Sequence, residues 1–245
     1  MPEAKLYCGT SGFAYTSWKP DFYPEKLPSG KFLSYYATRL NAVEVNYTYR
    51  RLASAATFEK WIAATPEEFM FLPKAHMKIT HQSKLVDAED FTRAFLESLE
   101  PLKNADRLGP ILFQLPPSLH ADPDRLGTFV RLLPRGLRVA FEFRNASWFD
   151  EKIYKLLQDC NAALCLAENE NVETPFVLTA DFVYLRLRKP DYGESELTSI
   201  AYRVDQYLQN AYPTFAIFKH EDTPAGALNA ETLLATERSK GIAVR

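Results

Sequence analysis

Short apolar runs alternate along this chain with segments in which apolar residues recur at helical spacing. The apolar runs occupy residues 5–9, 42–46, 69–74, 110–115, 138–144, 163–168, 182–188 and 215–222, and most of them end in a polar residue. Strands that alternate with helices favour a parallel sheet. Eight such repeats within 245 residues predict an α/β fold, a (β/α)8 TIM-type barrel that forms a single domain over residues 1–245.

Seven segments between these runs have the periodicity of helices that cover one face of a sheet. They are residues 31–40, 54–64, 87–102, 122–134, 147–160, 194–211 and 225–237. Ser29 is expected to cap the first segment, and Asp122 followed by Pro123 is expected to begin the fourth. Residues 168–180 leave no room for a full helix, so we expect the barrel to be irregular after its sixth strand.

The alternation of side chains along each strand predicts which residues face the barrel interior. The outward face of a barrel strand lies under helices and must be apolar, so Val43 and Val45 turn Glu44 inward. In the first strand Cys8 and Thr10 share a face. The same reasoning turns further residues inward: Asn46, Met70, Leu72, Lys74, Gln114, Ala140, Glu142, Arg144, Tyr184, Arg186 and Arg188.

Many of these inward residues are polar and lie near the carboxyl ends of the strands, where barrel enzymes build their active sites. We predict that Glu44 and Glu142 move protons, because two carboxylates in different environments can act as acid and base. Lys74 is the third predicted catalytic residue, and it becomes a Schiff-base amine if neighbouring cations lower its pKa. The predicted ligand-binding residues are Thr10, Ser11, Asn46, Tyr49, Gln114, Arg144, Trp148 and Arg186.

The balance of charge in this predicted ring points to an anionic ligand. Two carboxylates face three cations, namely Lys74, Arg144 and Arg186. A buried charge without a partner costs several kcal/mol, so the surplus cation indicates room for a phosphate or carboxylate. The alternative is a network of salt bridges that simply fills the barrel mouth.

Metal and cofactor motifs are weak in this sequence. Glu168, His220, Glu221 and Asp222 follow two strand ends and offer oxygen and nitrogen ligands, but no HExxH or similar spacing supports a metal site. No metal ligand is therefore assigned. GxGxxG, P-loop and GxSxG motifs do not occur, and the cofactor stays unknown.

Net charge and cysteine content limit which binding partners and which cellular compartment the sequence predicts. The formal net charge of -2 gives no overall basic footprint for nucleic acid or acidic lipid. Aromatic residues together with Arg50 and Arg51 in the loops leave nucleic acid open as a less favoured partner. An odd count of three cysteines, no secretion signal and no long apolar stretch predict a cytoplasmic protein without membrane contact. The oligomeric state is not predicted.

Several sequence blocks resemble the YecE-like family, a group described as a domain of unknown function. They are GTSGFAYTSW with DFYP, EVNYTYRR, FLPKAHMKITH, FQLPPS and FEFRNASWF, within about residues 6 to 235. The resemblance implies a TIM-type barrel and brings no established reaction or cofactor. The family pattern includes most of the inward residues and also His81. This chain departs from it at Asn145, Arg188 and Lys219, so the part of the mouth built by strands seven and eight is expected to differ.

Three functions stay open at this point. The favoured one is an enzyme that acts on a small anionic, hydroxylated molecule, such as a sugar phosphate or sugar acid. It would use metal-independent acid–base chemistry at the carboxyl-end mouth, as a hydrolase, isomerase or lyase. The second is a metal-dependent hydrolase of phosphodiesters or nucleic acid, and the third is a binding protein without catalysis. Fold by itself does not decide among them.

Overall fold

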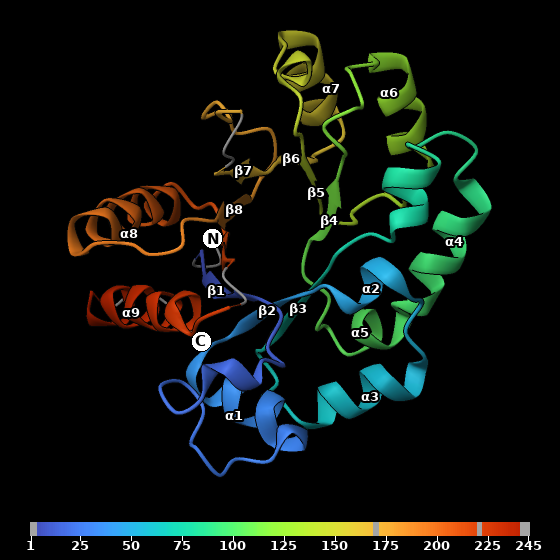
Figure 1. Ribbon diagram of the computed structural model, residues 1–245. Coiled ribbons are helices and arrows are strands. Elements are labelled where there is room, and N and C mark those ends of the chain that lie inside the picture. The colour runs from blue at the N-terminus through green and yellow to red at the C-terminus, as the bar shows by residue number, and fades with distance from the viewer. Residues whose placement is uncertain (1–3, 169–171, 220–221, 241–245) are drawn as a thin grey trace.

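A computed structural model describes residues 4–168, 172–219 and 222–240 of the chain (Figure 1). Its strands coincide with the predicted apolar runs. They are β1 (Leu6–Ser11), β2 (Ala42–Val45), β3 (Met70–Pro73), β4 (Ile111–Gln114), β5 (Val139–Glu142), β6 (Ala163–Leu164), β7 (Leu166–Ala167), β8 (Val183–Leu187) and β9 (Thr214–Phe218). The sixth predicted strand is therefore present as two short pieces, β6 and β7.

The strand pairings run around a ring, and all of them are parallel. One sheet has the order β3-β2-β1-β9-β8-β7, and the other has the order β4-β5-β6. Bridges from Phe71 to Leu108 and from Lys74 to Leu112 connect β3 with β4. On the other side, β6 pairs with β5 and β7 pairs with β8, with only Cys165 between them. The predicted α/β fold with parallel strands is thus confirmed, and its helices lie outside the ring of strands (Figure 1).

The barrel is irregular after the sixth strand, as predicted. Among the described residues between β7 and β8, which are 168 and 172–182, no helix forms. The Thr179 hydroxyl instead accepts a hydrogen bond from Leu164 N and donates one to Ala162 O, each at 2.7 Å. Thr174 donates in the same way to Ala167 O at 2.9 Å. Two threonine side chains therefore fasten this connection to the strands that a helix would otherwise cover.

The helices match most of the predicted segments. They are α1 (Phe32–Arg39), α2 (Tyr47–Arg50), α3 (Ala55–Ala63), α4 (Glu89–Ser98), α5 (Glu100–Asn104), α6 (Pro123–Leu132), α7 (Glu151–Asp159), α8 (Glu194–Gln209) and α9 (Ala225–Ser239). Asp122 caps α6 by accepting a hydrogen bond from Arg125 N at 2.9 Å, with Pro123 at the first helical position. Both features were predicted from the sequence.

Two helix predictions are wrong in detail. Ser29 does not cap α1, because residues Ser29–Lys31 form a separate 3-10 turn and α1 begins at Phe32 without a side-chain cap. Residues 87–102 form two helices rather than one. Pro101 lies in the first turn of α5, where its missing N–H is tolerated, whereas inside a continuous helix it would remove a hydrogen bond.

Two apolar layers confirm the predicted alternation of the strands. The larger layer lies between strands and helices and includes Val43, Phe113 and Phe141. The smaller layer fills the barrel and consists of Ala42, Leu72, Leu112, Ala140, Ala163, Cys165, Ala167, Phe182, Tyr184, Phe215 and Ile217. Most of the polar residues that were predicted to face inward lie further along the strands. The barrel therefore has an apolar plug beneath a polar mouth.

Candidate functional site at the barrel mouth

Arg186 on β8 lies at the centre of the polar layer and joins its two buried carboxylates. Its Nε is 2.9 Å from Glu44 Oε2 and its Nη2 is 2.6 Å from Glu44 Oε1. Its Nη1 donates to Glu142 Oε2. Arg186 is only 1% exposed, so it lies beneath the mouth surface. Three of its five N–H groups bind the two glutamates, and its prediction as a ligand-binding residue stays a prediction.

Glu44 on β2 accepts hydrogen bonds from two other strands, β1 and β8. Besides Arg186, Ser11 Oγ donates to Oε1 at 2.7 Å and Tyr184 OH donates to Oε2 at 2.9 Å. Asn46 Nδ2 in turn donates to Ser11 Oγ at 2.8 Å. Burial would raise the pKa of Glu44, but Arg186, Lys74 and the hydrogen bond from Ser11 together outweigh burial, and the pKa is lowered.

Glu142 on β5 accepts hydrogen bonds from three arginines and one glutamine. Gln114 Nε2 donates to Oε2 at 2.8 Å, and Arg144 Nε and Arg188 Nη1 each lie 3.1 Å from Oε1. Burial raises the pKa of this carboxyl, and the guanidiniums around it, Arg186 above all, bring it down to about 2. A carboxylate held ionised in this way has no proton to donate at neutral pH. Both carboxylates are engaged by guanidinium groups, as in the salt-bridge alternative, and the role of Glu142 and Glu44 as proton carriers stays a prediction.

Lys74 follows β3 and supplies an amine to the same cluster. Its Nζ donates to Gln114 Oε1 at 3.0 Å and lies 4.4 Å from the centre of the Tyr49 ring. Burial and the nearby Arg186 lower the pKa of Lys74 to about 8, although Glu44 and Glu142 act in the opposite direction. A lysine with a pKa near neutrality can exchange protons or attack a carbonyl.

His81 is a mouth residue that reasoning from the strands missed. Its ring meets the Tyr49 ring edge-on, with the two centres 5.4 Å apart, and its Nδ1 shares a hydrogen bond with the Thr80 hydroxyl at 2.9 Å. Burial, together with Lys74 and Arg144, lowers the pKa of His81. Its signal in the sequence was its place in the FLPKAHMKITH block of the family resemblance.

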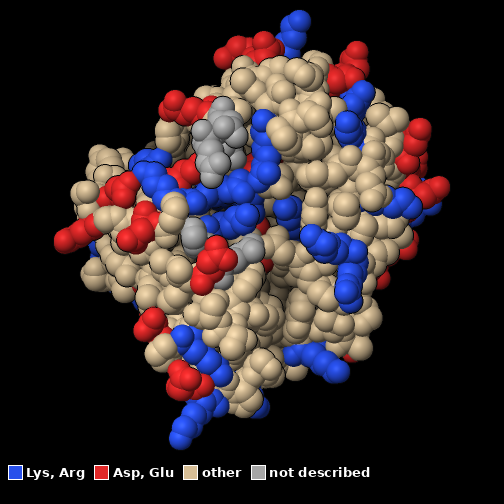
Figure 2. All heavy atoms as spheres, in the orientation of Figure 1, with Lys and Arg blue, Asp and Glu red and all other residues tan. Residues whose placement is uncertain are grey.

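The described mouth residues carry more positive than negative charge. Arg188 joins the three predicted cations, so among the described residues four cations surround the two buried carboxylates. Arg144 and Arg188 are 29% and 18% exposed. Figure 2 shows Lys and Arg side chains gathered over the ends of β7 and β8, beside a hollow near the centre of this face. Arg188 could have been included from the sequence, because alternation puts it on the same face as Arg186.

Two predicted ligand-binding residues lie away from the mouth. The Thr10 hydroxyl donates to Gly12 O at 2.7 Å and lies 2.9 Å from Tyr36 OH of α1, so Thr10 faces the helix layer. Trp148 is fully buried and stacks on Phe143 at 4.7 Å. Its Nε1 donates to Leu119 O at 2.7 Å. Thr10 thus lies on the outward face of β1, and Trp148 packs its loop against the barrel.

The candidate metal residues are only partly described. His220 and Glu221 lie outside the described residues. Glu168 accepts hydrogen bonds from Arg188 N at 2.8 Å and from Tyr192 OH. Within the described part of the chain, His, Cys, Asp and Glu side chains do not form a group of three that could hold a metal ion. No helix in that same part is long and apolar enough to cross a membrane.

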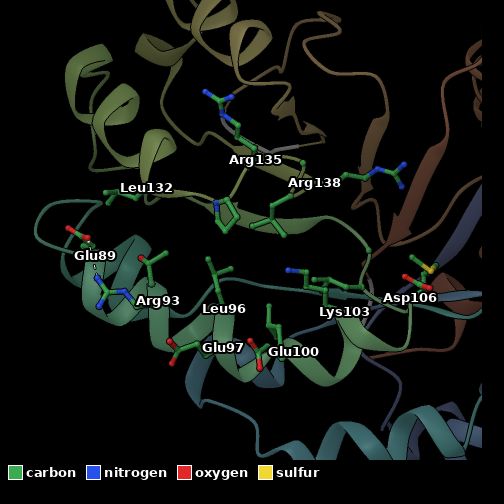
Figure 3. A pocket seen from close by; sticks show the side chains of 18 residues that line it. Glu89, Arg93, Leu96, Glu97, Glu100, Lys103, Asp106, Leu132, Arg135 and Arg138 are labelled. Atoms are coloured by element: carbon green, nitrogen blue, oxygen red, sulfur yellow. Dashed lines mark hydrogen bonds and ion pairs between the residues drawn. The ribbon is translucent and has the colours of Figure 1, made fainter.

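A separate pocket of about 660 Å³ lies beside the amino ends of β3 to β5 (Figure 3). Its wall of α4 and α5 faces the segment that precedes β5. Leu96 points into it, whereas Arg135 and Arg138 extend in different directions (Figure 3). The lining also includes Met70, Glu89, Thr92, Arg93, Glu97, Leu99, Glu100, Lys103, Asp106, Leu108, Gly109, Leu132, Pro134, Gly136 and Leu137. We call it the side pocket.

The fold and the charged mouth define this molecule as a parallel β/α-barrel protein with a polar layer at the carboxyl ends of its strands. A family model described as "Protein of unknown function DUF72" matches residues 7–242. The chain belongs to this family, which confirms the resemblance to YecE-like proteins.

Two named relatives support the family. UPF0759 protein YunF of Bacillus subtilis (strain 168) is 31% identical over 157 residues, which is 61% of this chain and 54% of that protein. UPF0759 protein YecE of Escherichia coli (strain K12) is 30% identical over 118 residues, which is 48% of this chain and 43% of that protein. The matches thus span about half the length of these relatives.

Solved structures agree on the fold. A DUF72 family protein from Thermotoga maritima MSB8 has a TM-score of 0.84 at 26% identity, covering 96% of this chain and 99% of that one. A DUF72 family protein from Enterococcus faecalis V583 has a TM-score of 0.78 at 20% identity, covering 97% and 99%. A family 2 AP endonuclease from Brucella melitensis has a TM-score of 0.56 at 12% identity, covering 96% and 98%. The last two likenesses concern the fold alone.

Proposed function

We propose that the barrel mouth binds a small anion and acts on it as an enzyme. One observation carries the proposal: among the described residues, the two buried carboxylates are already bound by guanidiniums, and four cationic side chains surround them, a surplus of cations over buried carboxylates. A phosphate or carboxylate would neutralise this surplus and accept charge-assisted hydrogen bonds. Arg144 is suited to hold it, because only its Nε is engaged with Glu142 in the described structure and the side chain is partly exposed.

The roles within the site differ from those that the sequence suggested. Glu44 and Glu142 hold Arg186 and orient the groups around it, so they are positioning residues. Lys74 moves the proton, because its pKa of about 8 lets it exist in both forms near neutral pH. Asn46 at the rim would orient a substrate hydroxyl, since its Nδ2 binds Ser11 and its amide oxygen can accept a further hydrogen bond. A hydroxylated anion such as a sugar phosphate or sugar acid fits these groups.

Thermal unfolding with a ligand panel tests this proposal. The panel contains inorganic phosphate, sugar phosphates, sugar acids and the uncharged parent sugars. A ligand at a hundred times its Kd stabilises the folded state by about 2.7 kcal/mol, which for this size raises Tm by several degrees. We expect a shift with the anions but not with the parent sugars, and a smaller one in Arg144→Gln. Arg135→Gln in the side pocket is the matched control and should retain the full shift. If no anion shifts Tm, the proposal is wrong.

Hydrolysis of phosphodiesters or nucleic acid is the second candidate. Arg51 lies 5.7 Å from the ring centre of Tyr47, and that tyrosine is 42% exposed beside β2. Exposed aromatic and basic pairs of this kind stack on bases and attract phosphates. A short single-stranded oligonucleotide, added with and without divalent metal, extends the panel. A shift that needs the oligonucleotide or the metal favours this candidate, and tight binding without turnover favours a binding protein.

A further inference from the structure

Lys74 differs from the other cations of the mouth in its partners. Arg144, Arg186 and Arg188 all bind carboxylates directly. Lys74 Nζ binds the neutral amide of Gln114 and lies over the Tyr49 ring. Within the described part of the chain, no carboxylate oxygen lies within the 4.0 Å of an ion pair with Nζ. The amine is therefore half-buried and has no direct counterion among the described residues.

This environment favours the uncharged form of the amine. Neighbouring guanidinium groups repel a further positive charge, and burial removes the water that would solvate it. With a pKa of about 8, roughly a quarter of Lys74 is neutral at pH 7.5, compared with about one in a thousand for an ordinary lysine. A desolvated lysine beside other cations is the type of amine that attacks carbonyl carbons.

We propose that Lys74 forms an imine with the carbonyl carbon of a small anionic aldehyde or ketone whose phosphate or carboxylate is held by Arg144. This inference rests on the proposed function and narrows its substrate class to anions that carry a free carbonyl. The partners of Lys74 in the cluster support it. Gln114 Oε1 accepts a hydrogen bond from Nζ, so it fixes the amine at the end of β3 on the side of the barrel interior.

The reaction balances without an added oxidant or reductant. The nitrogen lone pair of neutral Lys74 forms a bond to the carbonyl carbon as the carbonyl π bond breaks, and the carbonyl oxygen takes up a proton from solvent. The resulting carbinolamine loses water as its C–O bond breaks, which leaves a protonated C=N bond. The iminium carries the same positive charge as the ammonium form of Lys74. The cluster therefore still attracts the bound anion after the imine has formed.

Reductive trapping tests the inference. The full-length protein is incubated with glyoxylate, which carries a carboxylate, or with dihydroxyacetone phosphate, which carries a phosphate, and then with sodium borohydride. Borohydride converts an imine into a stable secondary amine, and peptide mass spectrometry locates it. Dihydroxyacetone is the uncharged control. We expect Lys74 to be labelled at least roughly tenfold faster than any other lysine. The anion that gives the faster labelling identifies the phosphate or the carboxylate class.

Two variants make the result specific. Lys74→Arg keeps the positive charge but should lose this label, and Lys103→Arg in the side pocket should keep it. Inorganic phosphate should slow labelling by competing for Arg144. The inference is overturned if lysines are labelled evenly, if Lys103 or another surface lysine reacts first, or if dihydroxyacetone labels Lys74 as fast as its phosphate does.

The same samples separate this inference from the proposed function. Glycerol phosphate and lactate carry the anionic group but no aldehyde or ketone. If they raise Tm while Lys74 is not trapped, the anion site is supported and the imine proposal is wrong. If no anion raises Tm and no imine is trapped at Lys74, both proposals are wrong.

Discussion

The barrel mouth and the side pocket are both lined by charged residues, but they hold those charges differently. In the mouth, Arg186 and the two glutamates are at most 1% exposed and bind one another across β2, β5 and β8. In the side pocket, Arg93 pairs with Glu89 one helical turn away at 3.2 Å, and both side chains are about 60% exposed. The first arrangement joins distant parts of the chain, and the second is local to one helix.

This difference decides what each set of charges can do. An exposed pair in a helix contributes about 0.3–0.5 kcal/mol, because water already solvates both partners. Removing one partner of a buried pair costs about 3–5 kcal/mol, because it leaves a charge without water or counterion. Substitutions of the mouth charges should therefore change both the stability and the chemistry of the protein. Substitutions of the side-pocket charges should change the stability little. Variants at the two sites should separate these effects.

The largest expected effect is that of Arg186→Met. Met fills much of the same volume, but it removes the guanidinium that binds Glu44 twice and Glu142 once. We expect the free energy of unfolding to fall by about 3–5 kcal/mol, measured by urea denaturation at pH 7. Arg93→Met is the matched control and should cost less than about 1 kcal/mol. Equal effects in the two variants would show that the mouth charges do not form one buried network.

A smaller effect is expected from acid. The pKa of Glu142 lies near 2 in the folded protein, below its ordinary value of 4.5, so unfolded chains bind its proton first as the pH falls. Stability from this carboxylate is therefore present above about pH 4.5 and is lost between there and pH 2. The loss amounts to about 3 kcal/mol, because each tenfold change in proton affinity between the folded and unfolded chain corresponds to roughly 1.4 kcal/mol.

Glu142→Gln provides the control for this pH dependence. The variant cannot titrate at that position, so its stability should be lower at pH 7 and should change less between pH 5 and pH 2 than that of the wild type. Denaturant unfolding across this range measures both curves. Parallel curves for the two proteins would mean that Glu142 does not carry the acid sensitivity.

The smallest effects are expected in the side pocket. Arg135→Gln removes a charge that extends away from the pocket centre (Figure 3). Its free energy of unfolding should stay within about 0.5 kcal/mol of the wild type, as is usual for surface substitutions. Anion affinity at the mouth should not change. A clear loss of anion binding in this variant would assign the ligand to the side pocket instead.

The sequence predicted the mouth well where alternation along single strands was enough. Glu44, Glu142 and Arg186 face inward because their neighbours Val43, Phe141 and Leu185 must face the helices. Alternation does not show which inward residues pair, since Arg186 reaches Glu44 across 142 positions of the chain. The four hydrogen bonds that each carboxylate accepts appear only in three dimensions.

The predictions for Thr10 and Trp148 rested on weaker signals in the sequence. Ser11 and Thr10 are adjacent, so they must lie on opposite faces of β1, and only the hydrogen bonds show that Ser11 is the inward one. Trp148 lies in a loop, for which no periodicity predicts a direction. Aromatic residues in loops either bind ligands or pack, and the hydrogen bond from Trp148 Nε1 to Leu119 O shows packing.

The titration of Lys74 tests the central claim most directly, because that claim places a near-neutral amine beside an anion site. Lysines labelled with 13C by reductive methylation report their pKa in NMR spectra, and Lys74→Arg assigns the Lys74 signal. We predict a midpoint near pH 8 and an upward shift when inorganic phosphate or a sugar phosphate binds, since an anion stabilises the ammonium form. A midpoint near the ordinary 10.5 that responds to no anion would contradict the account.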